Sequence, residues 1–285
     1  PPKSNGRKLP ITELARPFFL KQFAMQEAQR EQAEKDGSLK PGGTIIEGTS
    51  GNTGIGLALV AAAKGYKTII TMPANMSPER IKIIRSYGGQ VVLTDPEANM
   101  TGAGEKVAEL AANTPNSFVP GQGKNPANPG VHEATTGPEI WEDTEGDVDI
   151  FIAASGTGGT ISGTGHYLRR MKPDIEIIAV EPAGSPVLSG GEPGPHKIQG
   201  IGGGPTPPVT DEALFNEVIT VTDDDAYEMA RFAAKKEGIA VGISAGAALH
   251  AAAVVAARPE NKGKKIVVIV PDSGERYLSS DLYDE

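Results

Sequence analysis

Short runs of apolar, β-branched residues alternate with helical segments along most of the chain. Strands are expected at 44–47, 67–71, 90–94, 149–154, 175–180, 217–221 and 265–270. Helices are expected at 53–64, 78–88, 102–113, 160–171, from Asp223 or Asp224 to Gly238, and at 244–257. Strands that alternate with helices through short loops pair in parallel, and helices cover both faces of such sheets. The order predicts an α/β fold with mostly parallel sheets.

Two segments depart from this alternation. Residues 181–208 are rich in glycine and proline and show no periodicity, which predicts a long loop, and a loop of that length in a compact domain is usually functional. Residues 25–35 form a polar helical stretch without a broad apolar face, which we expect to lie on the surface.

Composition excludes several classes of function. The 285 residues carry a net charge of −9, whereas a protein that binds duplex nucleic acid neutralises phosphates with basic groups. No cysteine is present, so disulfides, thiolate metal sites and cysteine nucleophiles are excluded. The four histidines are far apart in the sequence, and we expect no metal site. With no long apolar run and no visible signal peptide, we expect no membrane association and a cytoplasmic protein.

Three glycine-rich loops each precede a helix, at 49–54, 156–160 and 242–246. A helix N-terminus presents unpaired N–H groups and the positive end of the helix dipole, and glycine lets an anion approach this backbone closely. Neither the P-loop pattern nor G-x-G-x-x-G follows a strand, which argues against a nucleoside triphosphate or a dinucleotide. The anions are then expected to be one phosphate and one carboxylate.

Six stretches of the sequence carry a resemblance to a known enzyme family. They are EGTSGNTGIGLA, NPANPGVHEATTGPEIWED, ASGTGGTISG, PGPHKIQGIG, GISAG and PDSGERYLS. On these motifs the chain, from about residue 32 to 282, resembles the cysteine synthase and cystathionine β-synthase family of pyridoxal-phosphate enzymes. PGPHKIQGIG and TTGPEIWED are more particular to the O-acetylserine sulfhydrylases, which are the cysteine synthases of this family.

The resemblance implies the two-domain architecture of fold type II pyridoxal-phosphate enzymes. A small α/β domain would span residues 25–127, and a large α/β domain would span 128–285 together with the N-terminal arm 1–24. The cofactor, pyridoxal 5′-phosphate, would lie in the cleft between them at the carboxyl ends of the strands. The family also implies a homodimer.

The resemblance further assigns roles to residues of the three loops. The cofactor 5′-phosphate would be held by Gly156, Thr157, Gly158, Gly159 and Thr160. Asn52 would bond the cofactor ring oxygen, and Ser244 would lie at the pyridine nitrogen, where a neutral partner suits β-elimination. The substrate side would comprise Thr49, Ser50, Gly51, Thr53, Gln122 and Gly200, and Asn52 would share in gripping the α-carboxylate.

The implied reaction is a β-replacement on O-acetyl-L-serine: acetate leaves and sulfide adds, which gives L-cysteine. A lysine would form the Schiff base with the cofactor and then act as general base, so its pKa must be lowered by its site. Counting back from the SGNTG motif places this position on Gln22, whereas the nearest lysine is Lys21. We predict that Lys21 has this role, because it is the only lysine between Lys8 and Lys35 and its apolar neighbours disfavour the ammonium form.

Two alternatives remain open at this point. The chain could be a cystathionine β-synthase-type enzyme with homocysteine as second substrate, although PGPHKIQGIG argues against this. It could also be a non-catalytic relative without a productive Schiff-base lysine, an alternative motivated by the offset between Lys21 and Gln22. The family is further known to dock the C-terminal tail of serine acetyltransferase in its active site, which makes that tail a possible partner.

Overall fold

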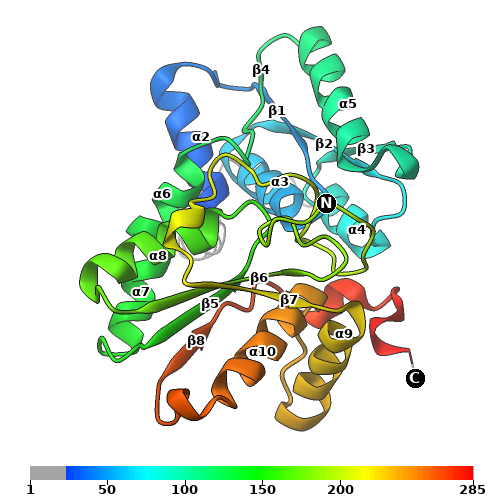
Figure 1. The fold of residues 1–285 in the computed structure, drawn as a ribbon. Helices are drawn as coiled ribbons and strands as arrows, with labels where there is room; N and C mark the ends of the chain where they lie inside the picture. The colour runs from blue at the N-terminus through cyan, green and yellow to red at the C-terminus, as the bar shows by residue number, and fades with distance from the viewer. Residues whose placement is uncertain (1–23, 285) are drawn as a thin grey trace, which may run out of the picture.

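The computed structural model describes residues 24–284 and contains two four-stranded sheets in two lobes (Figure 1). The first lobe, residues 24–118, has the strand order β3-β2-β1-β4, and every neighbouring pair is parallel. Its strands are β1 (Thr44–Gly48), β2 (Lys67–Pro73), β3 (Gln90–Thr94) and β4 (Ser117–Phe118).

The second lobe, residues 127–284, repeats this arrangement with the parallel order β7-β6-β5-β8. Its strands are β5 (Ile150–Ala154), β6 (Glu176–Pro182), β7 (Glu217–Val221) and β8 (Ile266–Val268). The two sheets and the helices on both of their faces confirm the predicted α/β fold of parallel sheets.

Helices cover both faces of the first sheet. They are α2 (Ala24–Asp36), α3 (Asn52–Lys64), α4 (Pro78–Ser86) and α5 (Asn99–Asn113). Side chains of β2 alternate between the two faces: Ile70 and Met72 pack into the cluster with α3 and α4, whereas the Thr71 hydroxyl donates to the Ala103 carbonyl of α5 at 2.8 Å. Strand β2 is therefore buried on both faces, between α3 and α4 on one side and α5 on the other.

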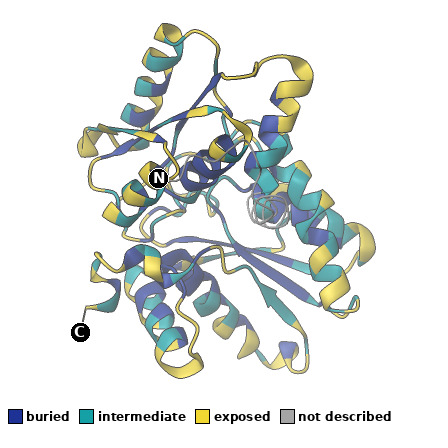
Figure 2. Ribbon diagram, turned by 180° about the vertical axis from the view of Figure 1, so that it is seen from behind, coloured by how far each residue is buried: buried dark blue, intermediate teal, exposed yellow. Residues whose placement is uncertain are grey.

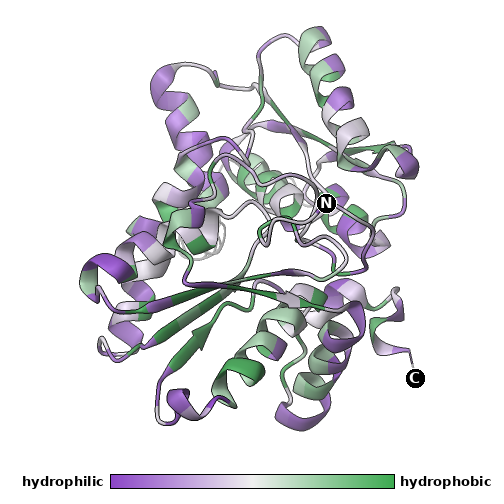
Figure 3. Cartoon of the chain, in the orientation of Figure 1, coloured by the Kyte–Doolittle hydropathy of each residue, from purple (hydrophilic) through white to green (hydrophobic). Residues whose placement is uncertain are grey.

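The second sheet is covered in the same way. Its helices are α6 (Ala127–Ala134), α7 (Thr136–Asp143), α8 (Gly159–Met171), α9 (Asp223–Phe232) and α10 (Ile243–Ala256). Ile150 and Ile152 of β5 belong to the core beneath α9 and α10, and Phe151 belongs to the core beneath α8. The buried strands of this sheet stand out in Figure 2, and their apolar character stands out in Figure 3.

The seven expected strands are confirmed with ends within two residues, but the sequence analysis missed three elements. These are β4, which has two residues, and helices α6 and α7. The predicted cap at Asp223 or Asp224 is wrong, because the Thr222 side chain accepts the Asp225 N–H and caps α9. That helix ends at Phe232 and continues to Glu237 as a π-helical turn.

The expectation that the polar helix at 25–35 lies on the surface is also wrong in part. Helix α2 packs against α3 and α6 and buries Gln26, Gln29, Arg30 and Ala33. Arg30 is buried because Glu27 and Glu34, one turn away on either side, both form ion pairs with its guanidinium. Ion pairs within the helix therefore accommodate the buried charge of Arg30, which a hydrophobicity pattern does not reveal.

The loops that follow β1 and β5 leave the carboxyl ends of their strands and enter α3 and α8 directly. In a parallel sheet this edge is where ligands bind. The long segment between β6 and β7 contains no helix or strand except the short turn Glu212–Leu214, as predicted, and runs through the region between the two lobes (Figure 1).

The buried carboxylate of Glu47 holds the linker between the lobes. Its Oε2 accepts the Gly121 N–H at 2.7 Å, and the Gln122 N–H also donates to it. Burial raises the pKa of the Glu47 carboxyl to about 7, and the two N–H donors only partly oppose this. Glu47 therefore fixes the backbone at Gln122 to strand β1.

This raised pKa predicts a pH-dependent stability. Between about pH 4.5 and 7 the folded protein keeps a proton on Glu47 that the unfolded chain releases, so this group lowers the free energy of unfolding as pH rises. Glu47→Gln does not titrate there. We expect the variant to gain about 2 kcal/mol relative to the wild type between pH 5 and pH 8, measured by urea unfolding.

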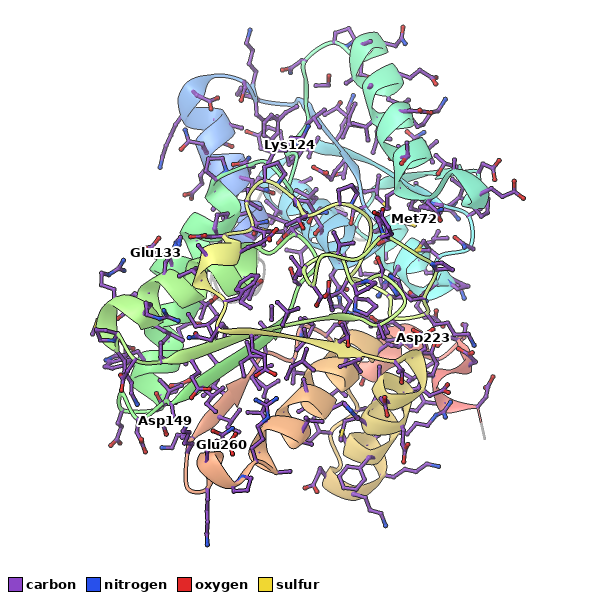
Figure 4. All side chains as sticks on the ribbon, viewed as in Figure 1. Met72, Lys124, Glu133, Asp149, Asp223 and Glu260 are labelled. Carbon is purple, nitrogen blue, oxygen red and sulfur yellow. The ribbon has the colours of Figure 1, made fainter. Side chains whose placement is uncertain are left out.

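Glu260→Gln is the matched control, because Glu260 is exposed at the far end of the second lobe (Figure 4). The difference in the free energy of unfolding between Glu260→Gln and the wild type should be the same at pH 5 and at pH 8. If the Glu47→Gln difference were also the same at every pH, Glu47 would titrate normally in the fold.

Candidate active site

A cavity of about 1200 Å³ lies between the lobes and collects residues from all three glycine-rich loops. Of the predicted site residues, the following line it: Thr49, Ser50, Gly51, Asn52, Thr53, Gln122, Gly156, Thr157, Gly158, Thr160, Gly200 and Ser244. Gly159 does not line the cavity but packs against Asn128. Lys21 lies outside the described residues.

The loop at 156–160 is built for close backbone contacts. A side chain on Gly156 would place its Cβ 2.5 Å from the Gly200 carbonyl oxygen, and one on Gly159 would lie 2.0 Å from Asn128 Oδ1. Among residues 24–284, the N–H groups of Gly156, Thr157 and Gly158 have no acceptor. Three residues with unpaired N–H groups thus line the cavity at the start of α8, where a helix N-terminus can bind a phosphate.

Buried Asn128 connects this loop to the linker between the lobes. Its Nδ2 donates to the Gln122 carbonyl at 2.8 Å and to Thr157 Oγ1 at 2.9 Å. The Gln122 side chain in turn accepts a hydrogen bond of 2.6 Å from the Thr53 hydroxyl. A continuous set of hydrogen bonds therefore runs from the 156–160 loop to the start of α3.

His132 lies next to the same loop. Its Nε2 is 3.2 Å from Thr160 Oγ1, and its Nδ1 is 2.9 Å from Thr136 Oγ1. Burial lowers the pKa of the His132 imidazole to about 4, so the ring is neutral at neutral pH. A neutral ring with one donor and one acceptor nitrogen orients the Thr160 hydroxyl without adding charge.

The loop at 49–53 forms the opposite wall. The Thr49 hydroxyl accepts the Gly51 N–H at 3.2 Å and tightens the turn, and Asn52 begins α3. The Ser50 carbonyl accepts a bond of 3.3 Å from the Arg80 guanidinium, which lies behind the loop. The hydroxyls and the helix N-terminus of this loop can bind a carboxylate.

Arg80 of α4 is almost fully buried between the lobes. Its Nη1 donates to Gln199 Oε1 at 2.7 Å, and its Nη2 donates to the Tyr277 hydroxyl at 2.6 Å. The guanidinium also lies 4.9 Å from the Tyr277 ring centre and 3.8 Å from Asp272 Oδ2. One side chain of the first lobe thus contacts two segments of the second.

Ser244 stands in the first turn of α10, is buried, and lines the cavity floor. Within residues 24–284 its hydroxyl has no hydrogen-bond partner, so it can serve a ligand. Together with the free N–H groups at 156–158, it provides what a flat heterocycle with a phosphate requires: a cradle for the anion and a polar group for a ring nitrogen. The described residues fit pyridoxal 5′-phosphate.

The residues of the site that the sequence analysis missed include Arg80, Asn128, His132, Asp272 and Arg276. All of these except Arg80 lie inside motifs that carried the resemblance, but no spacing rule singles them out. Among residues 24–284, no cluster of His, Asp and Glu suited to a metal ion is present, and no helix there has the length and apolar character needed to cross a membrane.

Comparison with known proteins agrees with this chemistry. The family described as pyridoxal-phosphate dependent enzyme matches residues 20–272. The chain is 52% identical over 257 residues to cysteine synthase of Staphylococcus aureus strain Mu50, and the match covers 90% of this chain and 82% of that protein.

Two solved structures extend the comparison. Cysteine synthase of Entamoeba histolytica superposes with a TM-score of 0.88 at 46% identity, covering 93% of this chain and 78% of that one. O-Acetylserine dependent cystathionine β-synthase of Helicobacter pylori superposes with a TM-score of 0.86 at 39% identity, covering 92% and 85%. The chain belongs to the family of pyridoxal-phosphate dependent enzymes, and within it to the cysteine synthase group.

Proposed function

We propose that this enzyme makes L-cysteine from O-acetyl-L-serine and sulfide with pyridoxal 5′-phosphate as cofactor. The observation that carries the proposal is the cavity in which a loop with free N–H groups faces a second helix N-terminus with hydroxyls. This pair of walls suits a phosphorylated cofactor on one side and an amino-acid carboxylate on the other. The 52% identity to a cysteine synthase supports the same substrates.

Each wall of the cavity has a distinct task in this proposal. Residues 156–160 hold the cofactor phosphate, and the Ser244 hydroxyl donates to the pyridine nitrogen. Asn52 bonds the ring oxygen. The bound cofactor supplies an electron sink for the charge that develops on the substrate α-carbon, and a neutral serine at the ring nitrogen keeps that sink moderate, which favours loss of the β-substituent.

The 49–53 loop binds the substrate α-carboxylate through Thr49, Ser50, Gly51 and Thr53, with Gln122 alongside. Gly200 lines the substrate side, where a side chain would narrow the cavity. Lys21 Nζ takes the α-proton, and acetate leaves as the Cβ–O bond breaks. Sulfide then forms the new Cβ–S bond, and the proton returns to the α-carbon.

We also propose how the domains of the chain are arranged and what the chain assembles with. We assign residues 25–127 to a small domain, and 128–285 with the arm 1–24 to a large one, so that the 49–53 loop moves with the small domain. We also propose a cytoplasmic homodimer whose cavity accepts the C-terminal tail of a serine acetyltransferase, since a terminal carboxylate resembles the substrate carboxylate.

An assay of the purified protein tests the reaction. Sulfide is the proposed nucleophile. With O-acetyl-L-serine, we therefore expect cysteine to form from sulfide at least 100-fold faster than cystathionine forms from homocysteine. The measurement is product quantification by mass spectrometry at equal nucleophile concentrations. Faster cystathionine formation would show that homocysteine, and not sulfide, is the second substrate.

Ser244→Ala tests the cofactor assignment. One hydrogen bond of about 1 kcal/mol is lost, so we expect the cofactor dissociation constant to rise about fivefold, measured by titrating the apoprotein. Ser86→Ala is the matched control, because the Ser86 hydroxyl also makes one bond, 2.7 Å to the Ile83 carbonyl, at an exposed site on α4. Equal affinities for both variants would remove Ser244 from the cofactor site.

Lys21→Ala tests the catalytic residue. After borohydride reduction, we expect mass spectrometry of the wild type to locate the cofactor on the peptide that contains Lys21, and the variant to carry none and to lose at least 1000-fold in rate. Lys35→Ala, on the exposed end of α2, should behave as the wild type. Cofactor on another lysine would overturn the assignment, and none in the wild type would indicate a non-catalytic relative.

A further inference from the structure

The side chain of Asn52 lies between two charged groups of the other lobe. Its Nδ2 donates to Asp272 Oδ2 at 2.8 Å, and its Oδ1 accepts a hydrogen bond from the Arg276 guanidinium. Asn52 and Arg276 line the cavity, and Asp272 is buried behind them. The first residue of α3 is thus held by the segment that follows β8, 220 and 224 residues away.

These two charges fix which way the amide points. A carboxylate only accepts hydrogen bonds and a guanidinium only donates them. If the amide were turned over, its carbonyl oxygen would face the Asp272 carboxylate and its NH₂ group would face Arg276, so both hydrogen bonds would become repulsive contacts. The orientation of an asparagine amide between neutral groups is not determined in this way, and either orientation is possible.

Asp272 and Arg276 together form a clamp on the Asn52 amide. The Asp272 carboxylate, which accepts the Asn52 N–H, is itself held rigidly. Asp272 Oδ2 also accepts the Tyr277 hydroxyl at 2.8 Å, and that hydroxyl receives a bond from buried Arg80. Asp272 Oδ1 lies against the backbone of Gly242, where an added Cβ would come within 1.9 Å of it. The Asp272 carboxylate therefore has little freedom to turn, and its position defines where Nδ2 of Asn52 lies.

We propose that Asp272 and Arg276 are positioning residues that lock the Asn52 amide so that its remaining Nδ2 N–H is available to the cofactor ring oxygen. The proposal rests on the role of Asn52 in the proposed function. With one N–H donated to Asp272 and the carbonyl occupied by Arg276, the second N–H is the polar group left to Asn52. An ionised ring oxygen needs a donor, and the clamp excludes the orientation that would present an acceptor.

Arg276→Met removes the donor and keeps the length of the side chain, while Asp272→Asn keeps the shape and removes the charge. Arg276→Lys restores a cationic donor. Arg170→Met is the matched control, because Arg170 is exposed on α8 and pairs with Glu133 at 2.6 Å, outside the residues that line the cavity. Each variant is converted to apoprotein and titrated with pyridoxal 5′-phosphate, and both the dissociation constant and the maximum of the visible absorption band are recorded.

We expect Arg276→Met to raise the dissociation constant five- to tenfold and to move the absorption maximum in the same direction as Asn52→Ala. Arg276→Lys should recover most of the affinity, and Arg170→Met should match the wild type. On the Asn52→Ala background, Arg276→Met should change the constant less than twofold, because a residue that acts through Asn52 has nothing left to position.

Equal effects of Arg276→Met with and without Asn52 would overturn the proposal, since Arg276 would then act independently of the amide. A lower melting temperature of Asp272→Asn with an unchanged absorption maximum would assign Asp272 a purely structural role and would likewise overturn it for that residue. If Asn52→Ala alone left affinity and spectrum unchanged, the role of Asn52 in the proposed function would fail instead.

Discussion

The buried guanidinium of Arg80 joins the two lobes on which the site depends. It extends from α4 of the first lobe and bonds the Ser50 carbonyl, Gln199 of the long loop and Tyr277 near the C-terminus. A buried charge without partners costs several kcal/mol, so these contacts must form together for Arg80 to be accommodated. The 49–53 loop, the long loop at Gln199 and the C-terminal segment at Tyr277 are therefore held in one arrangement.

Close backbone approach sets the shape of the cofactor wall. The Gly200 carbonyl and Asn128 occupy the positions where side chains at 156 and 159 would lie, so the loop can turn its N–H groups toward the cavity. Neutral His132 supports the Thr160 hydroxyl from behind. The phosphate-binding capacity of this wall comes from backbone donors and a helix end, since residues 156–160 contain no lysine or arginine.

Buried polar links, more than apolar contacts, connect the two halves of the site. The Glu47 carboxyl accepts the N–H groups of Gly121 and Gln122. Asn128 donates to the Gln122 carbonyl and to Thr157, and Asn52 bonds Asp272 and Arg276. Each of these side chains is bonded at two points, which restricts its rotation. Such links also explain why the lobes carry separate apolar cores and yet share a single cavity.

The sequence by itself determined the parallel α/β fold and the position of the loops that form the site. Strands buried on both faces read as apolar runs, and glycine-rich turns before helices are local signals, so both are visible without any tertiary contact. Helices α6 and α7 were missed because ANPGVHEA and TGPEIWED contain proline and glycine, which lower helix propensity. Strand β4 has only two residues and exists through its pairing with β1.

Tertiary structure alone decided which polar residues complete the site. Asn128, His132, Asp272 and Arg276 each bond a residue of the site that lies 28 to 224 positions away, and no periodicity records such pairs. The same holds for the buried polar face of α2 and for the raised pKa of Glu47, since both arise from desolvation and pairing in the folded chain. Local pattern fixes where the backbone turns, whereas burial and long-range hydrogen bonds fix what each side chain at the turn can do.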